Sequence, residues 1–269
     1  MSRFNQLFSK LKSENRIARI PFLMLGDPTP TASLTIINSV ISQGIDALEL
    51  GIPFSDPIAD GPIIQMAANR ARKHNATPAI CFEIIQKIRQ QHPTLPIGVL
   101  VYANLVYHQG ISSFYQQAQA AGVDAVLIPD VPTEEASVFC QAAKAHGIHP
   151  VLLATIACSD QDLKQLAVQS EGFTYVVTRA GVTGTGKASE FEMAQHIVKR
   201  LEKYGAPPAV FGFGIKYAQD IKLAHQHGAC GAIIGSALIE ALNHLDEQSL
   251  QSTQAVGAVV RKLFYENVN

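Results

Sequence analysis

The sequence predicts a (β/α)₈ TIM barrel with extra helices at its N- and C-terminal ends, formed as one domain by residues 1–269. Eight short β-rich apolar runs alternate with helical segments along the chain. Their centres lie 24 to 27 residues apart, from Leu100 through Leu127 and Leu152 to Val176, which fits one strand, one helix and two short loops. No linker or change in composition divides the chain. An open doubly wound sheet is the alternative, and the strand count favours the barrel.

The predicted strands are mostly continuous apolar runs, such as GVLV, AVLI and VLLA. Parallel strands that are covered by helices on both faces show this pattern. In chain order, the strands are predicted at Ile20–Leu25, Ala47–Gly51, Ile97–Tyr102, Ala125–Pro129, Pro150–Ala154, Thr174–Thr178, Ala209–Gly212 and Ala229–Gly235.

Apolar residues at helical spacing predict the extra helices. The first apolar face, which we expect to close the bottom of the barrel, consists of Phe4, Leu7, Phe8 and Leu11. The long interval between the second and third strands holds two helical stretches, near residues 62–74 and 78–91. The last apolar face consists of Val256, Val259, Val260, Leu263 and Phe264.

Composition and charge argue against several classes of function. The formal net charge of −1 gives no electrostatic reason to expect nucleic acid or an anionic membrane as partner. The four cysteines are scattered, without a CxxC motif or a Cys/His cluster. We therefore expect no metal site and no disulfides, which suits a reducing cytoplasm. No run approaches the roughly 18 apolar residues of a membrane span, and the start of the chain does not read as a signal peptide.

The first candidate catalytic residue is Glu49, near the end of the second predicted strand. Leu48 and Leu50 flank it, and Gly51 ends the run. Active sites of such barrels lie at the C-terminal ends of the strands, and a buried glutamate needs a partner or a function. Apolar surroundings raise the pKa of a carboxyl, which makes it a proton donor near neutral pH. The structural alternative is an ion pair with a core lysine or arginine.

The second candidate, Asp60, lies in the loop SDPIADGP that follows this strand. Pro53 and Pro57 restrict the loop backbone, and we expect both carboxylates at one mouth of the barrel. The alternative role of Asp60 is to cap the helix that begins near Pro62. Asp56 is interpreted as a turn residue or a partner contact.

Residues 178–188, TRAGVTGTGKA, contain most of a nucleotide-binding P-loop. The position that requires Ser or Thr for magnesium is Ala188, and the barrel-like strand count also disagrees with a P-loop. We interpret the segment as a mobile glycine-rich lid, with Thr183 and Gly184 near the ligand.

Two glycine turns, FGFGI at 211–215 and IIGSAL at 233–238, follow the seventh and eighth strands. Loops at these places form a recurrent phosphate site in barrels. Glycine lets backbone N–H groups approach an anion closely, and a helix N-terminus adds a favourable dipole. Gly214, Gly235 and Ser236 are the expected phosphate donors.

An apolar slot for a flat ring is expected at the strand ends. Tyr175, within the sixth strand, is expected to point to the barrel centre, and a core tyrosine is the alternative. The remaining candidates for this slot are Phe22, Leu100, Tyr102, Leu127 and Phe213.

Taken together, these motifs resemble the α subunit of tryptophan synthase over essentially the whole chain. The matching stretches are LELGIPFSDPIADGPIIQMA (48–67), VYAN (101–104), IPDVP (128–132), TYVVTRAGVTG (174–184), GFGI (212–215) and IIGSA (233–237). The first and fourth stretches are highly specific in combination. The fold of that family is a (β/α)₈ barrel, in agreement with the strand count.

The resemblance implies a lyase of tryptophan biosynthesis that cleaves indole-3-glycerol phosphate into indole and glyceraldehyde 3-phosphate by a retro-aldol step. Glu49 matches the acid that protonates indole C3 and is a candidate to take the proton of the glycerol hydroxyl. Asp60 matches the carboxylate that pairs with the indole N–H, and Tyr175 matches a hydroxyl next to Glu49. The matching phosphate and indole positions are Gly184, Gly214, Gly235, Ser236, Phe22, Leu100 and Leu127.

The resemblance also implies a partner, a pyridoxal-phosphate-dependent β subunit in an αββα assembly, with indole passing between them. No metal or organic cofactor is implied for this chain itself. Asp56 and Asn104 are the expected interface residues, and loops 53–60 and 179–188 are expected to close together. After Gly184 the chain reads TGKASE, whereas many relatives are more acidic or rich in Asn and Arg.

Two other functions remain alternatives. Another phosphosugar-binding barrel enzyme, such as an isomerase, typically uses a lysine or histidine base or a single glutamate, and the strand ends lack an obvious lysine. A non-catalytic activating subunit has no need to retain both Glu49 and Asp60.

Overall fold

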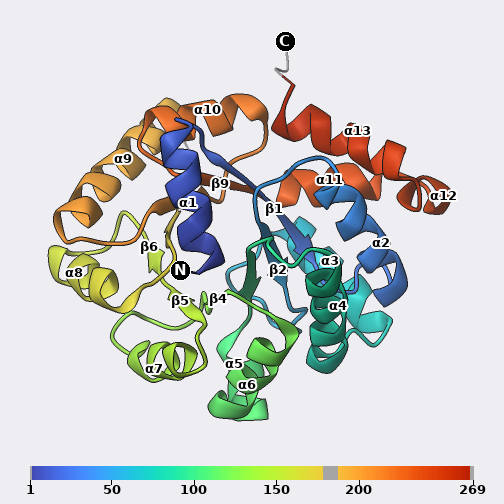
Figure 1. Ribbon diagram of the computed structural model, residues 1–269, viewed down its shortest axis with the longest axis horizontal. Helices are drawn as coiled ribbons and strands as arrows, with labels where there is room; N and C mark the ends of the chain where they lie inside the picture. Colours follow the sequence, from blue (N-terminus) through green and yellow to red (C-terminus); the bar gives the residue numbers. More distant parts are fainter. Residues whose placement is uncertain (1, 178–186, 267–269) are drawn as a thin grey trace.

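The computed structural model describes residues 2–177 and 187–266. Within these ranges, parallel strands form one sheet in the order β5-β4-β3-β2-β1-β9-β8-β7-β6, and helices surround it (Figure 1). The strands are β1 (Ala18–Met24), β2 (Leu48–Gly51), β3 (Ile97–Leu100), β4 (Ala125–Leu127), β5 (His149–Val151), β6 (Leu153–Ala154), β7 (Thr174–Val177), β8 (Ala209–Gly212) and β9 (Gly231–Ile234).

The two ends of this strand order, β5 and β6, are halves of a single run. β5 pairs with β4, and β6 pairs with β7. Leu152 lies between the halves, and its carbonyl accepts a hydrogen bond of 3.1 Å from the Tyr175 N–H. The sheet therefore closes through this run, and the predicted (β/α)₈ barrel is confirmed. The predicted fifth strand, Pro150–Ala154, is divided because its halves have different neighbours.

The helices follow the strands as expected for right-handed βα units, and none in the described ranges is long and apolar enough to cross a membrane. The helices predicted near 62–74 and 78–91 and after Leu245 are present. In order, the helices are α1 (Arg3–Ser13), α2 (Pro30–Ile41), α3 (Pro62–Lys73), α4 (Pro78–Gln91), α5 (Ala103–Gln109), α6 (Ile111–Ala121), α7 (Ser137–Ala145), α8 (Asp160–Gln169), α9 (Lys187–Lys203), α10 (Ala218–Gln226), α11 (Ser236–Asn243), α12 (Glu247–Leu250) and α13 (Thr253–Phe264).

Alternation along the strands separates the core into two layers. Leu48 and Leu50 of β2 belong to the layer between the sheet and the helices. Phe22 of β1 and Leu100 of β3 belong to the layer inside the barrel. Because successive side chains of a strand point to opposite faces, Glu49 faces the barrel interior.

Helix α1 covers one end of the barrel (Figure 1). The rings of Phe4 and Phe8 lie 5.1 and 6.4 Å from the ring of Phe173, measured between centroids. Phe173 precedes β7, so α1 closes the end at which the strands begin, as predicted. The opposite end, where the strands finish, is left for the site.

Candidate active site

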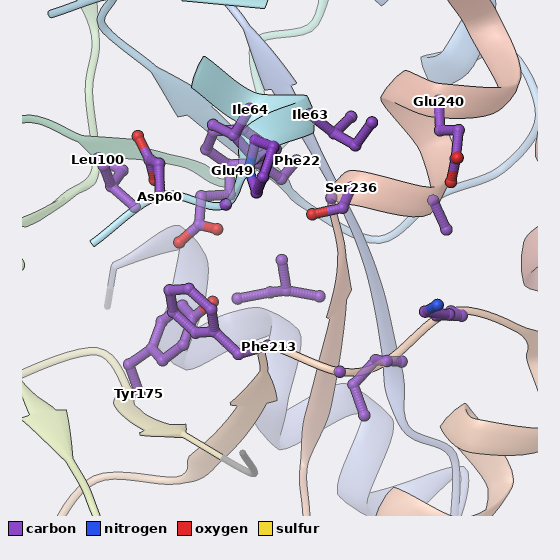
Figure 2. A pocket seen from close by; sticks show the side chains of 18 residues that line it. Phe22, Glu49, Asp60, Ile63, Ile64, Leu100, Tyr175, Phe213, Ser236 and Glu240 are labelled. Carbon is purple, nitrogen blue, oxygen red and sulfur yellow. The ribbon is translucent and has the colours of Figure 1, made fainter. Parts of the chain in front are cut away.

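A cavity of about 280 Å³ lies at the C-terminal ends of the strands. Figure 2 shows that side chains from β1, β2, β7 and α11 point into the same space. The sequence-predicted site residues that line it are Phe22, Glu49, Asp60, Leu100, Tyr175, Phe213, Gly214, Gly235 and Ser236. Residues from strands far apart in the sequence thus meet in one place, as expected for a barrel.

The remaining predicted site residues do not line the cavity or lie outside the described residues. Leu127 is buried in the barrel interior, in register with Leu100 on the neighbouring strand, but it does not line the cavity. Thr183 and Gly184 lie outside the described residues. Asp56 and Asn104 are exposed, on the loop after β2 and in the first turn of α5.

Glu49 projects from β2 into the cavity (Figure 2) and is only 4% exposed. Within the described residues, its carboxylate forms no hydrogen bond and no ion pair. None of these residues therefore provides the core lysine or arginine partner that the structural alternative requires. Burial raises the pKa of Glu49 from 4.5 to about 8, and the nearby charge of Asp60 adds to this shift. A carboxyl in this state retains its proton at neutral pH.

Asp60 lies at the end of the loop between β2 and α3, where its N–H donates to the Pro57 carbonyl at 3.1 Å. The N-cap of α3 is Gly61, so the alternative role of Asp60 as the helix cap is wrong. Burial raises its pKa from 3.8 to about 6, and a hydrogen bond from Tyr102 opposes the rise. Asp60 is therefore the first of the two carboxyls to ionise as pH increases.

Tyr102 connects this loop to the end of β3. Its ring is 1% exposed and stacks on Phe54 with centroids 5.3 Å apart. The hydroxyl accepts a hydrogen bond of 3.1 Å from the Ala59 N–H and donates one to Asp60. Sequence reasoning treated Tyr102 only as an apolar wall, although a hydroxyl at a strand end was a signal for a polar role.

Tyr175 is buried beside Glu49 and meets Phe213 edge-on, with ring centroids 5.8 Å apart. Burial, followed by the charges of Glu49 and Asp60, raises the pKa of its hydroxyl, which therefore stays protonated. A Cβ on Gly212 would collide with this hydroxyl. Glycine at 212 is thus what allows the tyrosine to reach the cavity.

The turn after β8 has an uncommon backbone conformation. Phe213 and Gly214 have positive φ angles of 59° and 95°, a region that glycine adopts readily and phenylalanine rarely. Residues held in such conformations concentrate at functional sites. On the neighbouring strand end, Gly235 precedes α11, and the hydroxyl of Ser236 is directed into the cavity (Figure 2).

Several lining residues were missed by sequence reasoning. Ile63 and Ile64 of α3 complete an apolar wall, whereas Lys216 and Glu240 bring charge. Two signals were available for the charged pair. Lys216 directly follows the glycine turn at 211–215. Glu240 lies four residues after Ser236, so Ser236 and Glu240 share one face of their helix.

Comparison with known proteins identifies the family of this chain. The family model of the tryptophan synthase alpha chain matches residues 8–267. A tryptophan synthase alpha chain from Yersinia pseudotuberculosis is 50% identical over 240 residues, which cover 89% of each chain. The chain belongs to the tryptophan synthase alpha chain family. Membership makes it the lyase chain that carries out the alpha reaction of tryptophan biosynthesis.

Solved structures of the family share the fold. The alpha subunit of tryptophan synthase from Legionella pneumophila is similar with a TM-score of 0.85 and 28% identity, covering 97% of this chain and 96% of that one. A chain from the tryptophan synthase α2β2 complex of Pyrococcus furiosus has a TM-score of 0.79 and 31% identity, with coverages of 91% and 97%.

Proposed function

We propose that the cavity cleaves indole-3-glycerol phosphate into indole and glyceraldehyde 3-phosphate, with Glu49 as the acid and base and Asp60 as the electrostatic partner. One observation carries this proposal: two carboxyls of different proton affinity share the cavity. The pKa of Asp60 is about 6 and that of Glu49 about 8. Between these values one carboxyl is ionised while the other holds a proton, which is the division of roles that acid–base catalysis needs.

In the proposed reaction, Glu49 first donates its proton to C3 of the indole ring. The glycerol hydroxyl on the adjacent carbon then returns a proton to the Glu49 carboxylate. As that O–H bond breaks, its electrons form the aldehyde, and the electrons of the carbon–carbon bond return to the ring as indole leaves. Glu49 ends with the proton count at which it started, so no other acid or base is required.

Asp60 acts on the charge that this step creates. Protonation of C3 places positive charge on the ring nitrogen, and an ionised Asp60 that accepts a hydrogen bond from the ring N–H stabilises it. The hydrogen bond from Tyr102 favours the ionised form of Asp60 and holds it in position. A preorganised charge of this kind is usually among the largest contributions to catalysis.

The rest of the cavity suits the two ends of the substrate. Phe22, Leu100 and Phe213 provide apolar surfaces for the indole ring. At the other end, Gly235 and Ser236 begin α11, whose N-terminal N–H groups favour the phosphate.

Other predicted contacts belong to the same proposal. Gly214 is expected to add a backbone donor to the phosphate, and Leu127 to support the indole pocket from beneath. Thr183 and Gly184 are expected to cover the substrate.

We also propose a β subunit that carries pyridoxal phosphate as the partner, with no cofactor needed in this chain. Within the described residues, no group of three or more His, Cys, Asp or Glu side chains is placed to hold a metal ion. Exposed apolar side chains support a docking face around the cavity mouth. Ile58, Tyr107 and Ile156 are 82%, 57% and 40% exposed and follow β2, β3 and β6. Asp56 and Asn104 lie on the first two of these segments.

The test is indole release from indole-3-glycerol phosphate by the purified chain, alone and with the β subunit. Glu49→Gln should lower kcat by about 10²–10⁴-fold or more, as expected for the loss of a general acid, while substrate binding is retained. Asp60→Asn should also lower kcat, because the charge is lost. Turnover of Glu49→Gln equal to wild type would refute the role of Glu49. Isomerisation of a phosphosugar without indole release would favour the isomerase alternative.

A further inference from the structure

The charges that line the cavity are unfavourable for a phosphorylated substrate. Its described lining residues include three carboxyls and one cationic side chain, Lys216. Glu49 holds its proton at neutral pH, so Asp60 and Glu240 are the carboxyls that bring negative charge. A phosphate ester carries about −1.5 to −2 charges at pH 7. The N-terminus of α11 contributes the equivalent of only about half a positive charge. A cationic side chain in the cavity wall is therefore needed to balance the charge of the phosphate.

Lys216 lies at the end of the cavity where we propose that the phosphate group of the substrate binds. It follows the turn of Phe213 and Gly214, and its N–H donates to the Asp220 carboxylate at 2.8 Å. Asp220 is buried in the first turn of α10, so the main chain at this position is fixed. The Lys216 side chain is exposed and lines the cavity.

Glu240 brings the opposite charge to the same end. It lies on α11 four residues after Ser236, and Figure 2 shows both residues on this helix at the cavity. Its exposed side chain carries a carboxylate, whose negative charge repels a phosphate. Lys216 and Glu240 thus bring opposite charges to this end of the cavity.

We propose that Lys216 is a phosphate-binding residue of this cavity and that Glu240 opposes it, so that the pair sets the affinity for the phosphorylated substrate. This rests on the proposed function in one respect, namely that the substrate carries a phosphate. Both side chains act on binding and touch none of the reacting atoms.

The test compares Lys216→Met with three variants. Lys216→Arg keeps the charge, Glu240→Gln removes the opposing one, and Lys73→Met changes the net charge equally at the exposed far end of α3, outside the lining. The readouts are KM and kcat for indole-3-glycerol phosphate and, separately, the Kd of inorganic phosphate by calorimetry.

We expect Lys216→Met to raise KM and the phosphate Kd by about 10-fold, as for loss of a hydrogen bond between charged groups, with kcat within about 2-fold. Glu240→Gln should lower KM and the phosphate Kd, whereas Lys216→Arg and Lys73→Met should match wild type. The increase in the phosphate Kd of Lys216→Met should be smaller at high salt.

A phosphate Kd unchanged in Lys216→Met would overturn the inference. Failure of wild type to release indole would count against the proposed function alone, because the phosphate Kd is measured without turnover.

Discussion

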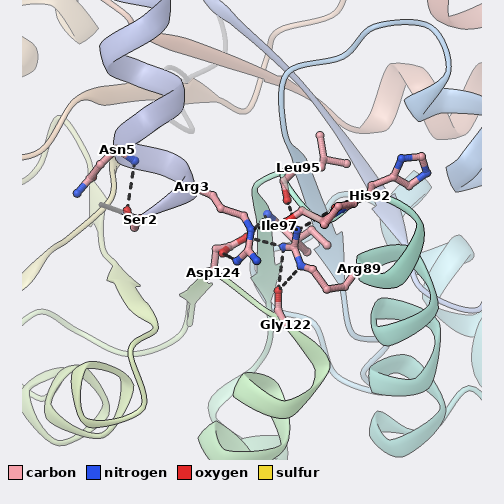
Figure 3. Close-up of polar contacts among 10 residues, drawn as sticks. Ser2, Arg3, Asn5, Arg89, His92, Leu95, Ile97, Gly122 and Asp124 are labelled. Atoms are coloured by element: carbon pink, nitrogen blue, oxygen red, sulfur yellow. Dashed lines mark hydrogen bonds and ion pairs between the residues drawn. The ribbon is translucent and has the colours of Figure 1, made fainter.

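The two ends of the barrel each contain a buried carboxylate, and they differ in what surrounds them. Asp124, just before β4, accepts hydrogen bonds from Arg3 at 2.7 Å, Arg89 at 2.6 Å and the Ile97 N–H at 2.8 Å (Figure 3). Glu49, at the opposite end, has no such partner within the described residues. A buried carboxylate that is fully paired holds structure together, whereas an unpaired one is available for proton transfer.

The contacts around Asp124 also explain how α1 is held against its end of the barrel. Arg89 donates to the carbonyls of Gly122, His92 and Leu95 in addition to Asp124 (Figure 3). Arg3, in the first turn of α1, joins the same carboxylate. The network fastens α1 and the end of α4 to the strands β3 and β4.

The largest effect on stability should come from Asp124→Asn. Removal of this charge leaves Arg89, whose side chain is 12% exposed, without its anionic partner, and breaking a buried pair costs about 3–5 kcal/mol. Urea unfolding should show this loss, while kcat per folded molecule stays close to wild type. Glu49→Gln should show the reverse, with stability retained and kcat lost. Equal destabilisation by both variants would mean that the two ends do not differ as described.

A smaller effect is expected on the pH dependence of kcat. Activity should rise as pH increases through about 6, because Asp60 must ionise, and fall as pH increases through about 8, because Glu49 loses its proton. Tyr102→Phe removes a hydrogen bond that lowers the pKa of Asp60. The acidic limb should therefore move to higher pH by up to about one unit, the worth of one hydrogen bond. The basic limb should stay in place.

The matched control for this shift is Tyr115→Phe. Tyr115 is also buried but lies in the outer layer, packed on Phe114 and His146. Its variant should leave both limbs unchanged. A Tyr102→Phe profile identical to that of the control would show that the hydroxyl does not act on Asp60.

The same contrast explains how much of the molecule could be predicted from its sequence. The barrel and most of the site were predictable, because buried parallel strands are continuous apolar runs and Glu49 interrupts one of them. The Asp124 network was not, because Arg3 and Arg89 lie 121 and 35 residues from their partner in the sequence. Whether Asp60 caps α3 was equally undecidable from local sequence, since glycine and aspartate are both good caps.

The cavity boundary also depended on contacts that the sequence does not show. Leu127 and Leu100 are neighbours in register, yet only Leu100 lines the cavity. The lining comes from β1, β2, β3, β7 and β9 and from the turns after β8 and β9, together with α3 and α11, and none of the described lining comes from β4, β5 or β6. The cavity therefore lies to one side of the barrel axis. The packing of the loops and helices sets this position, and strand periodicity carries no information about it.

The most direct measurement is the titration of the Glu49 carboxyl by carbon NMR, with Glu49→Gln used to assign its signal. An unpaired, buried carboxyl should titrate with a midpoint near 8. A midpoint near the ordinary value of 4.5 would mean that Glu49 is solvated or paired with a cation, and would contradict its assignment as the proton donor.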